Sequence, residues 1–179
     1  REEILHAFSK VPGIYVPSMY EPSYNEDGTL ASFNPIYEDV PRTITKEIVL
    51  VFDKAPYPEK PLVPYIKVTQ DRVTLEIMRG CIRGCRFCQA GMIYRPTRQK
   101  NVETLKKYAY EMLHSSGHEE ITLSSLSSSD YECLKDLTYF LIDDIGNDDV
   151  NISLPSLRID SFALDVMKKV QDIKKSSLT

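Results

Sequence analysis

Residues 79–91 read Arg-Gly-Cys-Ile-Arg-Gly-Cys-Arg-Phe-Cys-Gln-Ala-Gly and hold three of the chain's four cysteines, Cys81, Cys85 and Cys88. Their spacing is C-x3-C-x2-C, and Phe87 directly precedes the third cysteine. Gly80 and Gly84 permit the tight turns that let three thiolates of so short a loop face one point. Converging thiolates form a soft, anionic pocket suited to an iron–sulfur cluster or to zinc. Because such sites usually take four protein ligands, a triplet predicts one coordination position left for another molecule.

The composition is ordinary for a globular protein, with 42% hydrophobic and 27% charged residues among 179. A net charge of −4 gives no overall basic surface, so charge alone does not indicate nucleic-acid binding. No apolar run approaches the length of a membrane span and the N-terminus lacks a signal-peptide pattern, so no membrane partner is expected. Three clustered cysteines plus Cys133 form no paired disulfide framework, which predicts a reducing, cytoplasmic location.

A change in composition near residue 65 predicts two domains. Nine of the eleven prolines lie at or before Pro64, which argues against long helices there. Residues 1–65 are predicted to be a β-rich, Pro/Tyr-rich segment with a helix over 1–10, a hairpin that turns at 25–28 and a strand over 47–51.

The proline-rich stretch 55–64 cannot be helical, because each proline removes a backbone donor and restricts the preceding residue. We interpret it as a stiff linker on the surface. The alternative is a strap that closes one edge of the domain that follows.

Strands and helices alternate in residues 66–179, which predicts an α/β fold. The predicted strands are 73–78, 120–124 and 150–154. The predicted helices begin at Asn101 and run to about His114, at a Ser-x-x-Glu capping box over 129–132, and at Ser161. Three successive βα units favour a parallel sheet.

The cysteine motif, directly after an apolar strand, resembles that of the radical S-adenosylmethionine (SAM) superfamily. In that superfamily three cysteines hold a [4Fe-4S] cluster whose fourth iron binds SAM. The wider stretch 71–91 is similar to radical SAM proteins with a cobalamin-binding-type N-terminal domain, a subfamily of uncharacterised Fe-S oxidoreductases. The cobalamin signature Asp-x-His-x-x-Gly does not occur in the sequence. No cobalamin binding by this chain is therefore expected.

The resemblance implies a partial (β/α) barrel, of which residues 66–179 supply about three βα units as a fragment of a longer protein. It also implies an enzyme of oxidoreductase or transferase type that reductively cleaves SAM to a 5′-deoxyadenosyl radical and acts on an unknown substrate. The expected partners are the rest of its own chain and an electron donor such as flavodoxin or ferredoxin. Half a barrel leaves open strand edges, which argues against activity of the fragment alone. Self-pairing is one way to cover those edges.

The resemblance assigns Cys81, Cys85 and Cys88 to the cluster and places the backbone of Phe87 near the adenine of SAM. The alternative for Phe87 is an aromatic packed into the barrel mouth. No side chain is assigned a catalytic role.

Ser125, Leu126 and Ser127 occupy the place where the family often binds the amino group of SAM, although the usual glycines and glutamate are absent. A serine-rich loop and helix cap is the alternative. Arg158 is a candidate for the SAM carboxylate, because a guanidinium binds a carboxylate through two hydrogen bonds. A surface ion pair with Asp160 or Asp165 is its alternative.

Two other classes of protein use clustered cysteines. One is a zinc-stabilised binding module without catalysis, with His118 or Cys133 as fourth ligand, but such modules usually carry a second cysteine pair. The other is an electron-transfer iron–sulfur protein, whose cluster requires a fourth cysteine. We therefore favour the radical SAM interpretation.

Overall fold

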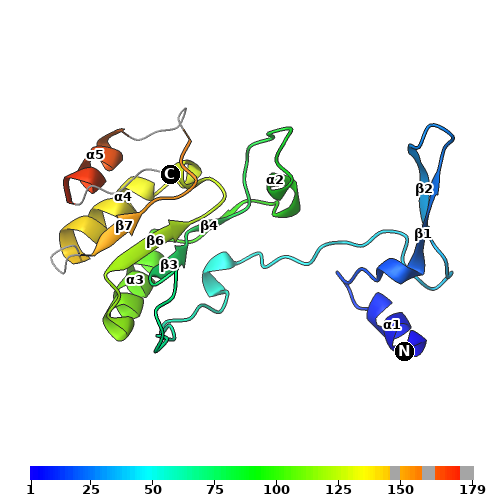
Figure 1. Cartoon of the computed structure of the whole chain (residues 1–179), viewed down its shortest axis with the longest axis horizontal. Coiled ribbons are helices and arrows are strands. Elements are labelled where there is room, and N and C mark those ends of the chain that lie inside the picture. Colours follow the sequence, from blue (N-terminus) through cyan, green and yellow to red (C-terminus); the bar gives the residue numbers. More distant parts are fainter. Residues whose placement is uncertain (146–149, 159–163, 174–179) are drawn as a thin grey trace. The chain divides into compact units, whose positions relative to one another are not determined.

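The computed structural model describes residues 1–145, 150–158 and 164–173 (Figure 1). The chain divides into two compact units, residues 1–49 and 50–179. Residues 50–65, which the sequence assigns to the N-terminal segment, are grouped here with the second unit. The cysteines all lie in the second unit.

The first unit consists of a helix and a β-hairpin. The elements are α1 (Glu2–Ser9), the 3₁₀ turn η1 (Pro17–Met19), β1 (Tyr20–Tyr24) and the antiparallel β2 (Leu30–Pro35). The predicted helix and hairpin are thus confirmed. The predicted strand over 47–51 is wrong, because this stretch pairs with no strand among the described residues and Leu50 is 76% exposed. Its β-branched residues favour extended backbone, but a strand also requires a partner.

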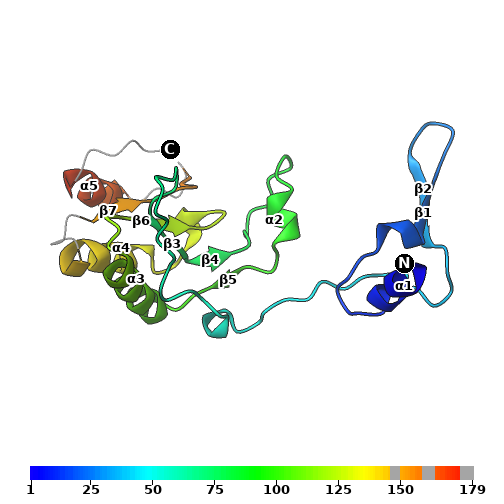
Figure 2. The same ribbon diagram turned by 60° about the horizontal axis from the view of Figure 1, so that its bottom comes forward.

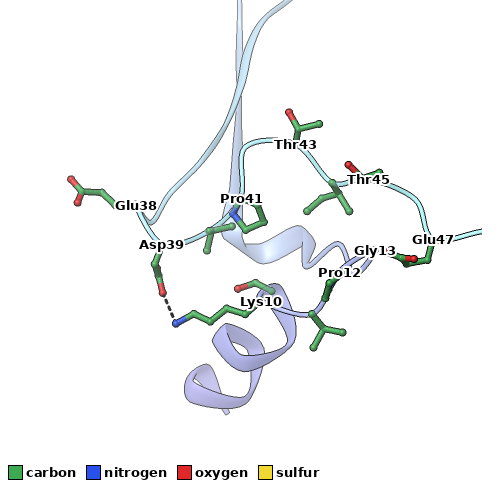
Figure 3. A pocket seen from close by; sticks show the side chains of 13 residues that line it. Lys10, Pro12, Gly13, Glu38, Asp39, Pro41, Thr43, Thr45 and Glu47 are labelled. Atoms are coloured by element: carbon green, nitrogen blue, oxygen red, sulfur yellow. Dashed lines mark ion pairs between the residues drawn. The ribbon is translucent and has the colours of Figure 1, made fainter.

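A small core of Val16, Met19, Tyr20 and Val40 holds the first unit together. A hollow of about 480 Å³ lies between residues 9–13 and 38–47 (Figure 3). Beside it, Lys10 Nζ lies 3.2 Å from Asp39 Oδ2. This ion pair is exposed to solvent, and exposed pairs of this kind contribute little to stability.

The second unit is built on a parallel sheet. Its strands β3 (Val73–Glu76), β6 (Glu120–Ser124) and β7 (Asn151–Ser153) lie in the order β3-β6-β7. Helix α3 (Val102–Ser116) joins the first two strands, and α4 (Leu134–Phe140) with its π-helical continuation η4 (Leu141–Ile145) follows β6. Helix α5 (Leu164–Ile173) follows β7. The mixed α/β fold with a parallel sheet is confirmed, and the three described strands form an open sheet.

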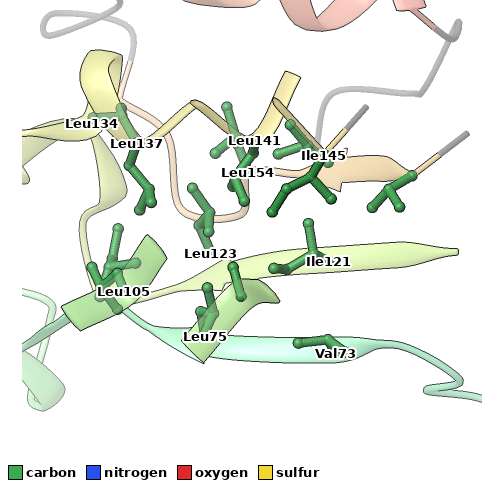
Figure 4. Close-up of a cluster of buried hydrophobic side chains, with 14 of the residues drawn as sticks. Val73, Leu75, Leu105, Ile121, Leu123, Leu134, Leu137, Leu141, Ile145 and Leu154 are labelled. Carbon is green, nitrogen blue, oxygen red and sulfur yellow. The ribbon is translucent and has the colours of Figure 1, made fainter. Parts of the chain in front are cut away.

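Helices cover one face of this sheet. Leu75 and Leu123 are fully buried and pair in register, and they pack with Leu105 of α3 and Leu137 of α4 (Figure 4). The alternate residues on the strands are polar and less buried, as Thr74 is exposed. A parallel sheet covered on both faces is apolar on both. The alternation therefore indicates that, within the part of the chain that the structure describes, the helices bury one face of this sheet and leave the other more accessible.

Of the helix caps that the sequence predicts, the structure confirms some and contradicts one. Asn101 caps α3, as its Oδ1 accepts from Glu103 N at 2.9 Å, and Gly117 ends α3 with φ +71°. The predicted capping box over 129–132 is wrong: α4 begins after Cys133 without a side-chain cap. The hydroxyl of Ser129 accepts instead from the N–H of Arg158, on another loop, at 2.9 Å. The predicted cap Ser161 lies outside the described residues.

Candidate functional site

Cys81, Cys85 and Cys88 lie on a hairpin, here called the cysteine hairpin, that comprises residues 78–99. Its legs are β4 (Met78–Arg79) and β5 (Arg98–Gln99), which pair in antiparallel fashion, and its loop carries the short helix α2 (Ala90–Ile93). In both ribbon views this loop extends from β4 and β5 away from the three-stranded sheet (Figures 1 and 2). Since β4 directly follows β3, the hairpin begins at the carboxyl end of the first parallel strand.

Gly80 allows the two legs of the cysteine hairpin to approach closely. Its φ is +88°, and a Cβ at this position would lie 2.6 Å from the carbonyl oxygen of Tyr94 and 3.0 Å from that of Pro96. Both the backbone conformation and the space therefore require glycine. Gly84, by contrast, has open space around it.

The three thiols of the loop are half-buried and are not disulfide-bonded. The N–H of Arg83 donates to Cys81 Sγ at 3.4 Å, and the guanidinium of Arg158 donates to Cys85 Sγ at 3.9 Å. Hydrogen bonds to sulfur stabilise its negative charge, as in iron–sulfur sites. Within residues 1–145, 150–158 and 164–173, no three or more Cys, His, Asp or Glu side chains are grouped so that they could hold a metal ion. Three thiols on one loop are suitable ligands for an iron–sulfur cluster. In this structure, however, the three sulfurs do not converge on one point.

An ion pair connects the cysteine hairpin to the loop after β6. Arg83 donates to Asp130 through Nε at 3.0 Å and Nη2 at 2.5 Å. The side chain of Asp130 is only 7% exposed and also accepts from Ser127 Oγ at 2.8 Å. The hydrogen bonds from Arg83, and secondarily that from Ser127, hold the pKa of Asp130 below its ordinary value of 3.8. Asp130 is therefore ionised at neutral pH.

The loops after β6 and β7 are joined by hydrogen bonds. Ser128 is fully buried, and its hydroxyl donates to the carbonyl of Pro155 at 2.7 Å. Its N–H donates to the carbonyl of Ser156 at 3.2 Å. Together with Asp130 and Arg158, these contacts bring together three loops at the carboxyl ends of the parallel strands. Ligand sites of β/α folds lie at this end of the strands.

The residues predicted to contact SAM differ in their surroundings. Phe87 is 92% exposed, and Leu126 is 39% exposed. Ser127 is buried with its hydroxyl on Asp130, and Ser125 Oγ accepts from the N–H of Ser127 at 3.1 Å.

Arg158 is brought to the cysteine hairpin through its contact with Cys85. Of its two alternative partners, Asp165 forms an ion pair with Lys135, and Asp160 lies outside the described residues.

Sequence reasoning missed Asp130 and Lys100. The predicted capping box contains Asp130 but gives it no role in a site; its place in a loop after a buried strand is a sequence signal for such a role. Lys100 is only 2% exposed, and nothing in its local sequence marks it as buried.

The other ligands considered for zinc lie elsewhere. His118 Nε2 is 3.1 Å from Asp71 Oδ1, and Cys133 immediately precedes α4. Within the described ranges neither belongs to a potential metal-binding group. None of the helices in those ranges has the length and apolar character needed to cross a bilayer.

Comparison with known proteins identifies the family of the chain. Residues 75–178 match the Radical SAM superfamily. An uncharacterised protein of Methanocaldococcus jannaschii is 40% identical over 94 residues, which are 52% of this chain and 20% of that protein. The chain thus spans about a fifth of the length of this relative. With a match that begins inside β3 and includes all three cysteines of the hairpin, the chain belongs to the radical SAM superfamily.

Proposed function

We propose that the chain is part of a radical SAM enzyme in which Cys81, Cys85 and Cys88 hold a [4Fe-4S] cluster and SAM binds the remaining iron. The supporting observation is the position of the cysteine hairpin at the carboxyl end of the first parallel strand, within the residues that match the superfamily. When bound, such a cluster supplies one electron to the sulfonium of SAM, which splits into methionine and a 5′-deoxyadenosyl radical.

The protein's own residues hold and orient the reactants in this proposal. Asp130 fixes Arg83 and thereby the first turn of the cysteine loop. Arg158 places a positive charge beside Cys85, where it offsets thiolate charge and can bind the carboxylate of SAM. The backbone of Phe87 would contact the adenine of SAM, and backbone carbonyls of residues 125–127 would accept from its amino group, because the hydroxyl of Ser127 is used by Asp130 and its N–H by Ser125 Oγ.

The substrate and the complete barrel belong to the longer protein in this proposal. We infer that the three-stranded sheet is the first part of a (β/α) barrel that further βα units complete. The isolated chain then binds the cofactors but lacks the walls that exclude water from a radical. An enzyme of oxidoreductase or transferase type, cytoplasmic and reduced by flavodoxin or ferredoxin, fits this arrangement. Any cobalamin-binding-type domain lies elsewhere in such a protein.

The test is anaerobic reconstitution of the chain with iron and sulfide, followed by visible spectroscopy and electron paramagnetic resonance with and without SAM. We expect a broad absorption at the blue end of the spectrum and a reduced-state signal that shifts when SAM is added. Cys85→Ser should abolish both, whereas Cys133→Ser, which removes a thiol outside the hairpin, should retain both. A colourless protein that keeps zinc through dialysis would support the binding module instead.

A further inference from the structure

The segment 50–64 precedes the residues that match the superfamily, yet it contacts the base of the cysteine hairpin. Its 3₁₀ turn η2 (Phe52–Lys54), drawn in cyan in Figure 1, contacts β5, the second leg of the cysteine hairpin. Phe52 is buried, Asp53, Ala55 and Tyr57 are half-buried, and residues 58–60 are exposed. The first part of the segment is therefore a component of the second unit, and only the following part has the exposure of a linker.

Phe52 packs against the base of the cysteine hairpin, where it contacts residues of both legs. Its side chain is buried at 4% exposure, and its ring faces the guanidinium of Arg79, on the first leg, at 4.9 Å. The same ring faces the ammonium of Lys100, directly after the second leg, at 4.1 Å. Cation–π contacts at this distance are favourable, more so when the cation is removed from water. One aromatic ring thus touches both legs where they leave the sheet.

Lys100 fixes the second leg through side-chain and backbone contacts. Its ammonium donates to the carbonyl of Phe52 at 3.0 Å and lies 5.2 Å from the ring centre of Tyr57. Its N–H donates to the carbonyl of Ile77 at 2.9 Å, and its own carbonyl accepts from the hydroxyl of Tyr131 at 2.9 Å. Lys100 therefore joins segment 50–64, the first leg and the loop after β6 at one point.

Tyr57 extends the attachment along the edge strand β3. Its hydroxyl donates to the carbonyl of Thr74 at 2.6 Å and accepts from the N–H of Glu76 at 2.9 Å. These groups lie on a strand at the edge of the described sheet. A side chain that binds edge backbone groups blocks pairing with another strand. Of the proline-rich stretch 55–64, the part up to Tyr57 thus covers an edge of the second unit, as the strap alternative predicts.

We propose that Phe52 and Lys100 are positioning residues for the cysteine hairpin, which hold its two legs together where they leave the sheet. A lysine is seldom fully buried, and an ammonium removed from water costs free energy unless its partners compensate. Packing alone would favour an apolar side chain at position 100. The lysine adds a hydrogen bond from its ammonium, at the base of the cysteine hairpin, to the carbonyl of Phe52 in segment 50–64. The consequence for a cluster rests on the function proposed above, whereas the ordering of the hairpin does not.

The test compares Lys100→Met, which keeps the length of the side chain and removes its charge, with Lys100→Arg and the wild-type chain. Hydrogen exchange of the metal-free protein reports on the amides of residues 77–79 and 98–100, which lie at the hairpin base. We expect exchange there to be about tenfold faster in Lys100→Met, with α3 and β6 unchanged. In reconstituted protein, a chelator should remove iron roughly threefold faster. Lys100→Arg should restore both towards wild type.

A stability control separates positioning from folding. Val166→Ala removes buried apolar atoms from α5 and should lower the unfolding temperature without selectively accelerating exchange at the hairpin base. Lys100→Met should leave the unfolding temperature unchanged or raise it. Equal hairpin exchange in Lys100→Met and wild type would overturn the proposal, as would selectively faster exchange at the hairpin base in Val166→Ala.

Phe52→Leu provides the test if Lys100→Met does not fold. It keeps an apolar anchor and removes the ring face, so exchange should again rise at the hairpin base and not in β6. A uniform rise across the hairpin and the sheet would contradict positioning. If the wild-type chain assembles no cluster, the proposed function fails, and hydrogen exchange still decides whether Phe52 and Lys100 position the hairpin.

Discussion

Asp130 links the cysteine loop to the loop that follows β6. Its nearly buried carboxylate accepts from two nitrogens of Arg83 and from the hydroxyl of Ser127. These hydrogen bonds stabilise the ionised form and lower its pKa in the folded state. Such a group stabilises the fold at pH values above its pKa in the unfolded chain, and this stabilisation is lost as the pH falls through the folded pKa.

Asp130→Asn should therefore reduce stability in a pH-dependent way. At pH 7 we expect a loss of roughly 1–3 kcal/mol in the free energy of unfolding, because hydrogen bonds to a charged group are removed. The difference from wild type should shrink as the pH falls below about 4. Urea unfolding at several pH values measures both quantities.

Asp136→Asn is the matched control for Asp130→Asn. Asp136 pairs with Lys106 at 3.4 Å but its side chain is 59% exposed, so its loss should cost at most about 1 kcal/mol. Parallel stability–pH curves for wild type and Asp130→Asn would show that the Arg83 ion pair makes no contribution.

At the scale of elements, α3 and α4 begin in different ways. The side chain of Asn101 caps α3 locally, whereas α4 lacks a side-chain cap and its neighbour Ser129 binds the loop after β7. A capping motif in the local sequence forms a cap only when its side chains have no more favourable tertiary contact. Ser129 has a tertiary acceptor role, which explains why its capping box does not form.

Asn101→Ala should lower the free energy of unfolding by about 1 kcal/mol, because the N–H of Glu103 loses its acceptor. Glu132→Ala serves as the comparison at the other helix and should change stability by less than about 0.5 kcal/mol. Thermal or urea unfolding of both variants provides the measurement. A comparable loss in Glu132→Ala would indicate that the capping box does form in solution.

The boundary between the two units lies near residue 65 by composition and at residue 50 in the structure, and the two positions predict different stabilities for shortened chains. A chain that begins at Leu50 keeps Phe52 and Tyr57, whereas one that begins at Ile66 lacks both and uncovers the edge of β3. The shorter chain should lose at least about 3 kcal/mol of stability, the cost of removing one buried aromatic side chain, and should aggregate more readily. Urea unfolding and light scattering test this. Equal stability of the two chains would place the boundary near residue 65.

Local spacing in the sequence is sufficient to predict several features of the fold and of the site. The cysteine motif, the alternation of β3 and β6 and the helix between Asn101 and Gly117 follow from periodicity and from the chemistry of helix ends. The match to the superfamily depends on the same local pattern. These features were therefore accessible before any contact between distant residues was known.

Contacts between groups far apart in the sequence become visible in the folded chain alone. The strand predicted over 47–51 does not form, since extended backbone needs a partner that the local sequence cannot supply. The meeting of Arg83 with Asp130, and of Lys100 with Phe52, spans 47 and 48 positions of sequence. Such pairs leave no periodic signal, because burial and charge pairing arise only when the chain has folded and water has been removed between them.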